Sequence, residues 1–179
     1  MRILHVNKLP RIVKNKRYLE KDLAVELSIK GAEIDISGEP EDEFTAEKII
    51  EALDLGFPYR VAMLIKEEDF ILQVINIKDH TRRRDLIRIK GRIIGTKGKT
   101  LKILTDLSDN FFELDDKNNR VGIIGNPENI QTSHTAIISL IKGSKTGNVY
   151  TYLEKHRPEK LIDLGLKKSK ETKKAKSNL

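Results

Sequence analysis

The chain has 179 residues and a net charge of +7, with 34% charged and 38% hydrophobic residues. This length fits one medium-sized domain or two small ones, and the basic balance favours nucleic acid or an anionic membrane surface as partner. The absence of cysteine excludes disulfides, thiolate zinc sites and a cysteine nucleophile. Apolar runs are too short for a bilayer-spanning helix or a secretory signal, so we expect a soluble, cytoplasmic protein.

The first third of the chain has the pattern of a strand, a helix, a hairpin and a second helix. We expect a strand over 1–6, a helix over 9–22, a hairpin over 25–37, a helix over 44–55 and a linking helix over 59–66. Eight acids between Asp35 and Asp54 accompany the second helix. They suit the positive end of a helix dipole, so we interpret them as a solvated surface rather than an acid–base site.

The chain from residue 70 onward is expected to contain a second set of strands and helices. We expect a strand over 70–77, helices over 81–94 and 99–107, strands over 110–114 and 120–124, a helix over 127–142 and a short helix over 149–153. His134 falls on the apolar face of the 127–142 helix, which favours a core position over a catalytic one. The tail 166–179 carries six lysines and little to bury, so we expect it to be disordered and either to contact phosphate or to aid solubility.

A tight glycine turn joins the helices expected over 81–94 and 99–107. Gly95 and Gly98 enclose Thr96 and Lys97, and the N–H groups that open the following helix lie at the positive end of its dipole, which favours an anion. A nucleotide-binding P-loop would need a glycine five residues before Gly98, where Ile93 stands. Two residues between glycines instead suit a clamp on a sugar-phosphate backbone.

Charge around this turn is one-sided. Between His80 and Thr105 a single acid, Asp85, accompanies nine basic residues, namely Arg82, Arg83, Arg84, Arg88, Lys90, Arg92, Lys97, Lys99 and Lys102. Such an excess favours a polyanion. The simpler alternative is a glycine-rich helix–helix turn with a solvated basic face.

The element order over 70–142 is strand, helix, GxxG, helix, strand, strand, helix, which is similar to the type I (eukaryotic-type) KH domain. The first half follows the same order without the glycine turn, since Lys14-Asn15-Lys16-Arg17 stands at the corresponding place. We therefore predict an α+β fold of two tandem type I KH domains, the first degenerate and lacking GxxG. The predicted domains are 1–66 and 67–165, followed by the tail 166–179.

Four segments carry a closer resemblance: 91–100, 123–127, 142–144 and 149–154. Together they resemble the archaeal tandem-KH ribosome-assembly proteins, relatives of the eukaryotic partner-of-Nob (Dim-type) family and, more distantly, of Krr-type factors. The resemblance implies binding near the 3′ end of small-subunit rRNA during subunit maturation. It also implies contact with the maturation endonuclease or with the alpha subunit of the second translation-initiation factor. Unlike many archaeal members, this chain lacks the first GxxG.

We predict a noncatalytic protein that binds single-stranded RNA, without a cofactor or a metal. The predicted RNA-binding residues are Arg88, Lys90, Arg92, Ile94, Gly95, Thr96, Lys97, Gly98, Lys99, Thr100 and Leu101. Within this set Ile94 and Leu101, with the strand over 110–114, would form an aliphatic floor under the bases. The alternative is a KH-fold scaffold for protein interactions with nonspecific RNA affinity. An enzyme is disfavoured because neither a P-loop nor a histidine pair is present.

Overall fold

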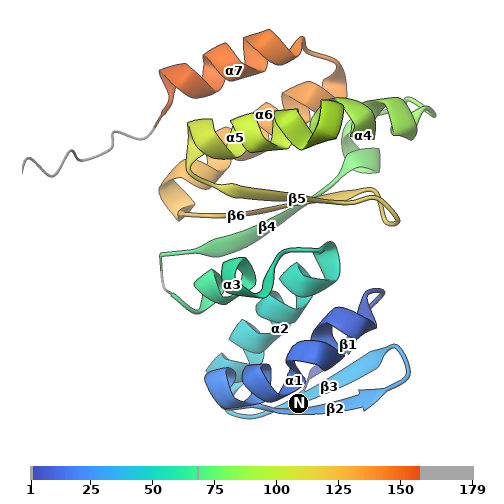
Figure 1. Ribbon diagram of the computed structural model, residues 1–179, viewed down its shortest axis with the longest axis vertical. Coiled ribbons are helices and arrows are strands. Elements are labelled where there is room, and N and C mark those ends of the chain that lie inside the picture. The colour runs from blue at the N-terminus through green and yellow to red at the C-terminus, as the bar shows by residue number, and fades with distance from the viewer. Residues whose placement is uncertain (1, 68, 158–179) are drawn as a thin grey trace, which may run out of the picture.

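The computed structural model describes residues 2–67 and 69–157, which form two halves, each with helices packed on a three-stranded antiparallel sheet (Figure 1). The predicted tail and the end of the predicted second domain lie outside these residues. No helix in the described parts of the chain is long and apolar enough to cross a membrane.

The first half follows the predicted order. Its elements are β1 (Arg2–His5), α1 (Leu9–Leu23), β2 (Glu26–Lys30), β3 (Glu33–Ser37) and α2 (Pro40–Leu55). Strand β3 is central and pairs antiparallel with β1 and β2. Gly31 turns the β2–β3 hairpin at φ 65°, a left-handed conformation in which glycine avoids a Cβ clash. Ile34 and Ile36 of β3 are fully buried in one core with the apolar faces of α1 and α2.

A short helix, α3 (Tyr59–Ala62), and a 3-10 turn, Met63–Lys66, lead into the second half. That half contains β4 (Ile71–Asn76), α4 (Leu86–Ile94), α5 (Lys99–Ser108), β5 (Phe111–Asp115), β6 (Arg120–Gly125), α6 (Pro127–Lys142) and α7 (Thr146–Lys155). Two more 3-10 turns, Ile77–His80 and Thr96–Gly98, precede α4 and α5 respectively. The sheet order is β4-β6-β5, which leaves β5 at an edge.

The bounds of several helices differ from the predictions. Helix α4 begins at Leu86 rather than at 81, because the Asp85 side chain accepts a hydrogen bond from the Arg88 N–H and caps the helix there (3.1 Å). Helix α2 begins earlier, with Pro40 in its first turn, a position where the missing N–H costs nothing. Helix α7 extends over 146–155, beyond the predicted 149–153.

Both faces of the second sheet are buried. One face carries Ile75, Phe112 and Ile123 into the core under α4, α5 and α6. The other face presents Ile124 and the half-buried Leu72, Val74 and Phe111 to the core of the first half. The first half is therefore stacked on the outer face of the second sheet, as the vertical order of layers in Figure 1 shows.

A polar network joins the halves beside this apolar contact. The Arg120 guanidinium donates to Asp54 Oδ2 of α2 (3.3 Å) and to Asp115 Oδ2 of β5 (3.0 Å). Asp54 Oδ1 also accepts from the backbone N–H groups of Asn7 (2.6 Å) and Lys8 (2.8 Å), which fixes the entry to α1. Asp54, one of the eight acids that the sequence assigned to a solvated surface, is thus buried at the contact between the halves.

Candidate nucleic-acid interface

The glycine turn between α4 and α5 has an unusual backbone. Gly95, Lys97 and Gly98 all have positive φ, at 71°, 53° and 76°. Helix α4 ends against this turn, where the Gly95 N–H donates to the Gly91 carbonyl (2.8 Å), and α5 begins at Lys99. The turn is therefore a tight corner between the two helices, with Thr96 and Lys97 exposed at its tip.

The two glycines serve different purposes. A Cβ on Gly95 would lie 2.1 Å from Thr100 Oγ1 and 2.8 Å from its backbone N, so Gly95 allows the turn to close onto α5. A Cβ on Gly98 would meet no atom within 4 Å, so only its positive φ favours glycine. Thr100 is 7% exposed beneath Gly95, which places this predicted RNA-binding residue inside the turn rather than on its outer surface.

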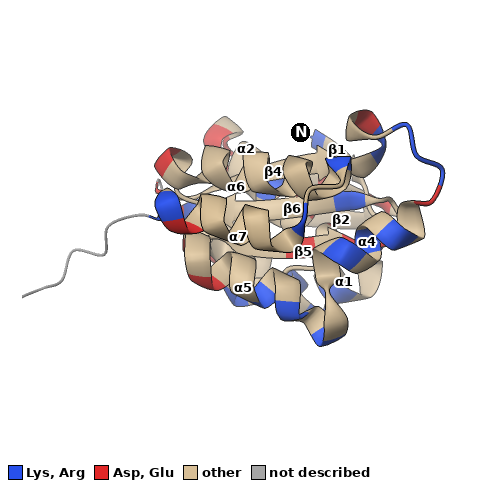
Figure 2. Ribbon diagram, turned by 90° about the horizontal axis from the view of Figure 1, so that it is seen from above, with Lys and Arg blue, Asp and Glu red and all other residues tan. Residues whose placement is uncertain are grey.

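The predicted cations divide into free and engaged groups. Thr96, Lys97 and Lys99 are exposed at the turn, and neither lysine forms an ion pair with another described residue. The Arg88 side chain is 81% exposed and lies 3.3 Å from Asp85. Positive charge available to a polyanion is therefore concentrated at the turn and along the outer flank of α4 (Figure 2).

Two further cations of α4 contact segments that are distant in the chain. Lys90 Nζ lies 2.6 Å from Asp116 Oδ1 and donates to the Asp116 carbonyl (3.1 Å), so it ties α4 to the β5–β6 turn. Arg92 donates to the Ser144 carbonyl in the α6–α7 connection. Arg88, Lys97 and Lys99 are thus exposed, whereas Lys90 and Arg92 also hold distant segments of the chain.

The expected apolar floor is only partly open. Ile93 and Leu104 are fully buried and anchor α4 and α5, whereas Ile94 and Leu101 are half-buried and lie on either side of the turn. Strand β5 lies at an edge of the sheet, and no strand among the described residues pairs with its outer side. Asn110, just before it, is fully buried with its amide on Ser133 Oγ (2.6 Å), so it anchors this edge.

Sequence reasoning missed two surface features of α4. Ile87 is 81% exposed beside Arg88, and Gly91 lies in the helix interior where a Cβ would meet nothing within 4 Å. An interior glycine costs a helix roughly 1 kcal/mol relative to alanine, and no neighbour in the fold requires it here. A glycine one helical turn before Gly95 was visible in the sequence. The sequence alone does not say whether this glycine serves packing within the protein or close approach by a ligand. The open space around it argues against a packing role.

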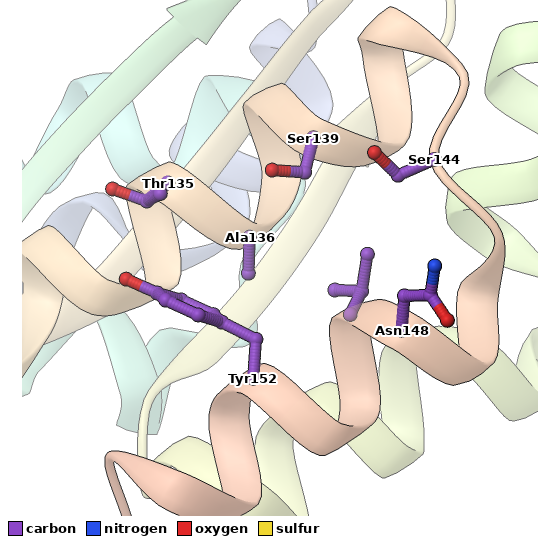
Figure 3. A pocket seen from close by; sticks show the side chains of 7 residues that line it. Thr135, Ala136, Ser139, Ser144, Asn148 and Tyr152 are labelled. Atoms are coloured by element: carbon purple, nitrogen blue, oxygen red, sulfur yellow. The ribbon is translucent and has the colours of Figure 1, made fainter.

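A small pocket of about 160 Å³ lies between α6 and α7. Figure 3 shows its lining of short polar and apolar side chains, contributed by Thr135, Ala136, Ser139, Ser144, Asn148, Val149 and Tyr152. The lining has no cation for phosphate and no group with the basicity of a general base. Among the described residues, no cluster of three or more His, Asp or Glu side chains could hold a metal ion. The exposed turn, with its unpaired lysines, is the candidate site.

Comparison with known proteins agrees with this geometry. Residues 71–158 match the model for the second KH domain of PNO1, described as a eukaryotic type KH-domain (KH-domain type I). A crystal structure of an a/eIF2alpha–aDim2p–rRNA complex from Pyrococcus horikoshii contains a chain with 30% identity and a TM-score of 0.79, over 87% of this chain and 92% of that one. The chain belongs to the PNO1/Dim2 family of KH-domain proteins.

Two curated relatives extend this family assignment. The KH domain-containing protein MJ0443 of Methanocaldococcus jannaschii is 30% identical over 79% of this chain and 65% of its own length. The pre-rRNA-processing protein pno1 of Emericella nidulans is 30% identical over 61% of this chain and 43% of its own length. The chain thus spans less than two thirds of the length of these PNO1/Dim2 relatives.

Proposed function

We propose that this protein holds a single-stranded segment of small-subunit rRNA during assembly of the small ribosomal subunit, at the 3′ end where maturation occurs. The observation that carries the proposal is the turn 95–98, whose positive-φ backbone presents Thr96, Lys97 and Lys99 within the residues that match a type I KH domain. Such a turn clamps a short stretch of nucleotide backbone while the bases lie on the neighbouring apolar surface. The protein acts by binding, without catalysis.

The names of the relatives support the biological setting. One is a pre-rRNA-processing protein, and a related chain occurs in a complex with rRNA and the alpha subunit of an initiation factor. We extend these partners to this chain as part of the proposal, together with the maturation endonuclease and a cytoplasmic location. The protein partners and the location rest on the family relationship rather than on a contact in this structure.

The first half, 1–66, is in this proposal a degenerate KH domain. Its order of strand, helix, two strands and helix matches the second half, except that the continuous helix α1 stands where the second half has α4, the turn and α5. The lost turn favours the alternative of a protein-interaction scaffold for this half. In the second half the turn is intact, and we assign RNA binding there.

The test is a fluorescence titration with a single-stranded oligonucleotide that matches the 3′ end of small-subunit rRNA, beside a scrambled strand. Thr96→Asp combined with Lys97→Asp reverses the charge at two exposed positions, so the fold should persist while affinity and preference for the rRNA strand are lost. A circular dichroism melt checks the fold. Equal binding of both strands by wild type and variant would reject the proposed site and favour the scaffold alternative.

A further inference from the structure

Two segments that are far apart in the chain bring cations together around Gly143, at the end of α6. A Cβ on Gly143 would lie 3.4 Å from Arg83 Nη2 and 3.7 Å from Arg92 Nη1, so two guanidinium groups border the same space. Arg83 belongs to the loop before α4, much of which is blue in Figure 2. Lys142 and Lys145 stand on either side of Gly143 in the chain and are exposed. We call Arg83, Arg92, Lys142 and Lys145 the Gly143 patch.

The positive charge of the Gly143 patch is not balanced by acids in the described part of the chain. None of its four side chains forms an ion pair with another described residue. Asp85, the acid closest to Arg83 in the sequence, lies 3.3 Å from Arg88 instead. Like charges that border one space repel each other, and a bound anion would relieve that repulsion.

Helix stabilisation accounts for only part of this arrangement. Arg92 donates to the Ser144 carbonyl, and cations near the end of α6 suit the negative end of its dipole. Lys145 differs, because it is the N-cap of α7, at the positive end of that helix, and the first turn of α7 contains no acid. A cation at this position disfavours the helix, so a role outside the fold explains Lys145 better.

The Gly143 patch lies on the flank of α4 that faces away from the β5–β6 turn. Lys90 and Arg92 are two residues apart, which is about 200° around a helix. Lys90 contacts Asp116 in the β5–β6 turn, whereas Arg92 contacts Ser144 in the α6–α7 connection, which lies beside α4 in Figure 1. Arg92 also stands three residues before Gly95. The patch therefore adjoins the glycine turn and lies across α4 from the β5–β6 turn.

We propose that the Gly143 patch binds the phosphates of a double-helical RNA segment that adjoins the single strand held at the turn. The inference rests on the proposed RNA-binding function. Double-stranded RNA is recognised mainly by its shape and by contacts to phosphates and 2′-hydroxyls, which cations supply without reading bases. Sites for single strands combine cations with aromatic rings on which bases stack. Neither the loop 81–85 nor the connection 143–145 contains an aromatic residue other than glycine-flanking serine and lysine neighbours, so the double helix fits better.

A comparison of two RNAs tests the inference. The first is a single strand of about 6 nucleotides, slightly longer than the roughly four that a KH turn clamps. The second is the same strand preceded by a hairpin stem of about 12 base pairs, because a 3′-terminal strand has neighbouring nucleotides only on its 5′ side. Wild type should bind the stem-bearing RNA about tenfold more tightly, through the added phosphate contacts.

Arg83→Ala with Lys145→Ala removes one cation from each segment of the patch. Affinity for the single strand should stay within about twofold of wild type, whereas affinity for the stem-bearing RNA should fall about fivefold or more. The slope of log affinity against log salt for the stem-bearing RNA should flatten by about 1.8, which is about 0.9 per lost contact with a double helix. A circular dichroism melt checks the fold. Arg83→Lys with Lys145→Arg keeps both charges and should retain most of the affinity.

The chain offers a matched control in Arg60→Ala with Lys155→Ala. This variant also removes one arginine and one lysine, from α3 and from the end of α7, and both side chains are exposed. Its net charge equals that of the patch variant, so a general effect of charge would weaken both variants alike. We expect the control variant to bind both RNAs as wild type does.

Four results would overturn the inference. Wild type could bind both RNAs equally, the patch variant could weaken both RNAs equally or neither of them, or the control variant could lose as much affinity as the patch variant. Polyglutamate could also displace the stem-bearing RNA as well as a hairpin of equal charge does, which would mean that the patch accepts an acidic polypeptide. If wild type does not bind even the single strand, the proposed function itself fails, which is a distinct result.

Discussion

The ring of Phe57 lies directly against the backbone of Gly122. A Cβ on Gly122 would come within 2.6 Å of Phe57 Cε2 and 2.9 Å of Leu55 Cδ1. Phe57 is 1% exposed and belongs to the first half, whereas Gly122 lies in the central strand of the second sheet. At this point a side chain of the first half packs directly on the backbone of the second sheet.

Gly122→Ala should separate the halves at this point. We expect it to lower the free energy of unfolding by about 1–3 kcal/mol, because the inserted methyl overpacks a buried contact. Urea unfolding measures the loss. Gly147→Ala in α7, where a Cβ would meet nothing within 4 Å, is the control and should be neutral or slightly stabilising. Equal free energies of unfolding for the two variants would mean that the structure accommodates the added methyl group at Gly122 without loss of stability.

Asp115 should make the free energy of unfolding depend on pH. Burial raises the pKa of Asp115, but hydrogen bonds from Asn118 and Arg120 and the charge of Lys8 outweigh burial, so the net pKa is lowered. A carboxylate with a lowered folded-state pKa stabilises the protein above its unfolded pKa, near 3.8, and that contribution is lost as pH falls through the folded value. Asp115→Asn should cost about 2 kcal/mol at pH 7, because hydrogen bonds to a charged carboxylate are weakened, and progressively less toward pH 3.

Glu113, on the same strand, should behave in the opposite way. Burial raises its pKa, and nearby Lys8 and Arg11 only partly oppose this effect. The charged form is thus disfavoured in the folded state, so stability falls as pH rises from the unfolded pKa through the folded one. Glu113→Gln should remove that loss and leave stability at pH 7 equal or higher. Urea unfolding between pH 3 and 7, in parallel with Asp115→Asn, checks the contrast; a clear loss for Glu113→Gln would refute it.

The two glycines of the turn should respond differently to substitution. Gly95→Ala should deform the turn, because the methyl collides with Thr100, and should abolish RNA binding together with some stability. Gly98→Asn should fold normally, since asparagine tolerates positive φ and the surrounding space is open. If Gly98→Asn keeps its melting temperature but binds RNA more weakly, the RNA backbone approaches Gly98 closely. Normal binding by Gly95→Ala would contradict the observed packing.

Lys97 and Lys90 provide a test of free against engaged cations. Lys97→Ala should flatten the slope of log affinity against log salt by about 0.7, because it removes one phosphate contact with a single strand. Lys90→Ala should alter the slope less, since Lys90 is held by Asp116. Titrations over a range of salt concentrations measure both slopes. Identical slopes for the two variants would show that the Asp116 contact gives way when RNA binds.

Local patterns were sufficient for most elements of the fold. The Gly95–Gly98 spacing and the apolar residues around it predicted α4, the turn and α5, because those signals are short-range. The sequence did not predict that Asp54 and Asp115 both bind Arg120. Both acids stand where local rules assign a helix surface and a turn, and only the stacking of the halves brings Arg120 between them.

The site was predicted with similar limits. Thr96, Lys97 and Lys99 are exposed at the turn as expected, and their role in RNA binding stays a prediction. The partners of Lys90 and Arg92 come from segments far along the chain, Asp116 and Ser144. Periodicity fixes which face of a helix a residue occupies, but not which distant loop comes to meet it.

The covered outer face of the second sheet has a consequence for how this chain could be divided. A fragment cut at the predicted boundary, from 67 onward, would keep the glycine turn but expose Leu72, Val74, Phe111 and Ile124 to water. A contiguous apolar patch of this kind promotes self-association. The proposed RNA-binding turn thus lies in a segment whose sheet depends on the first half to cover one of its faces.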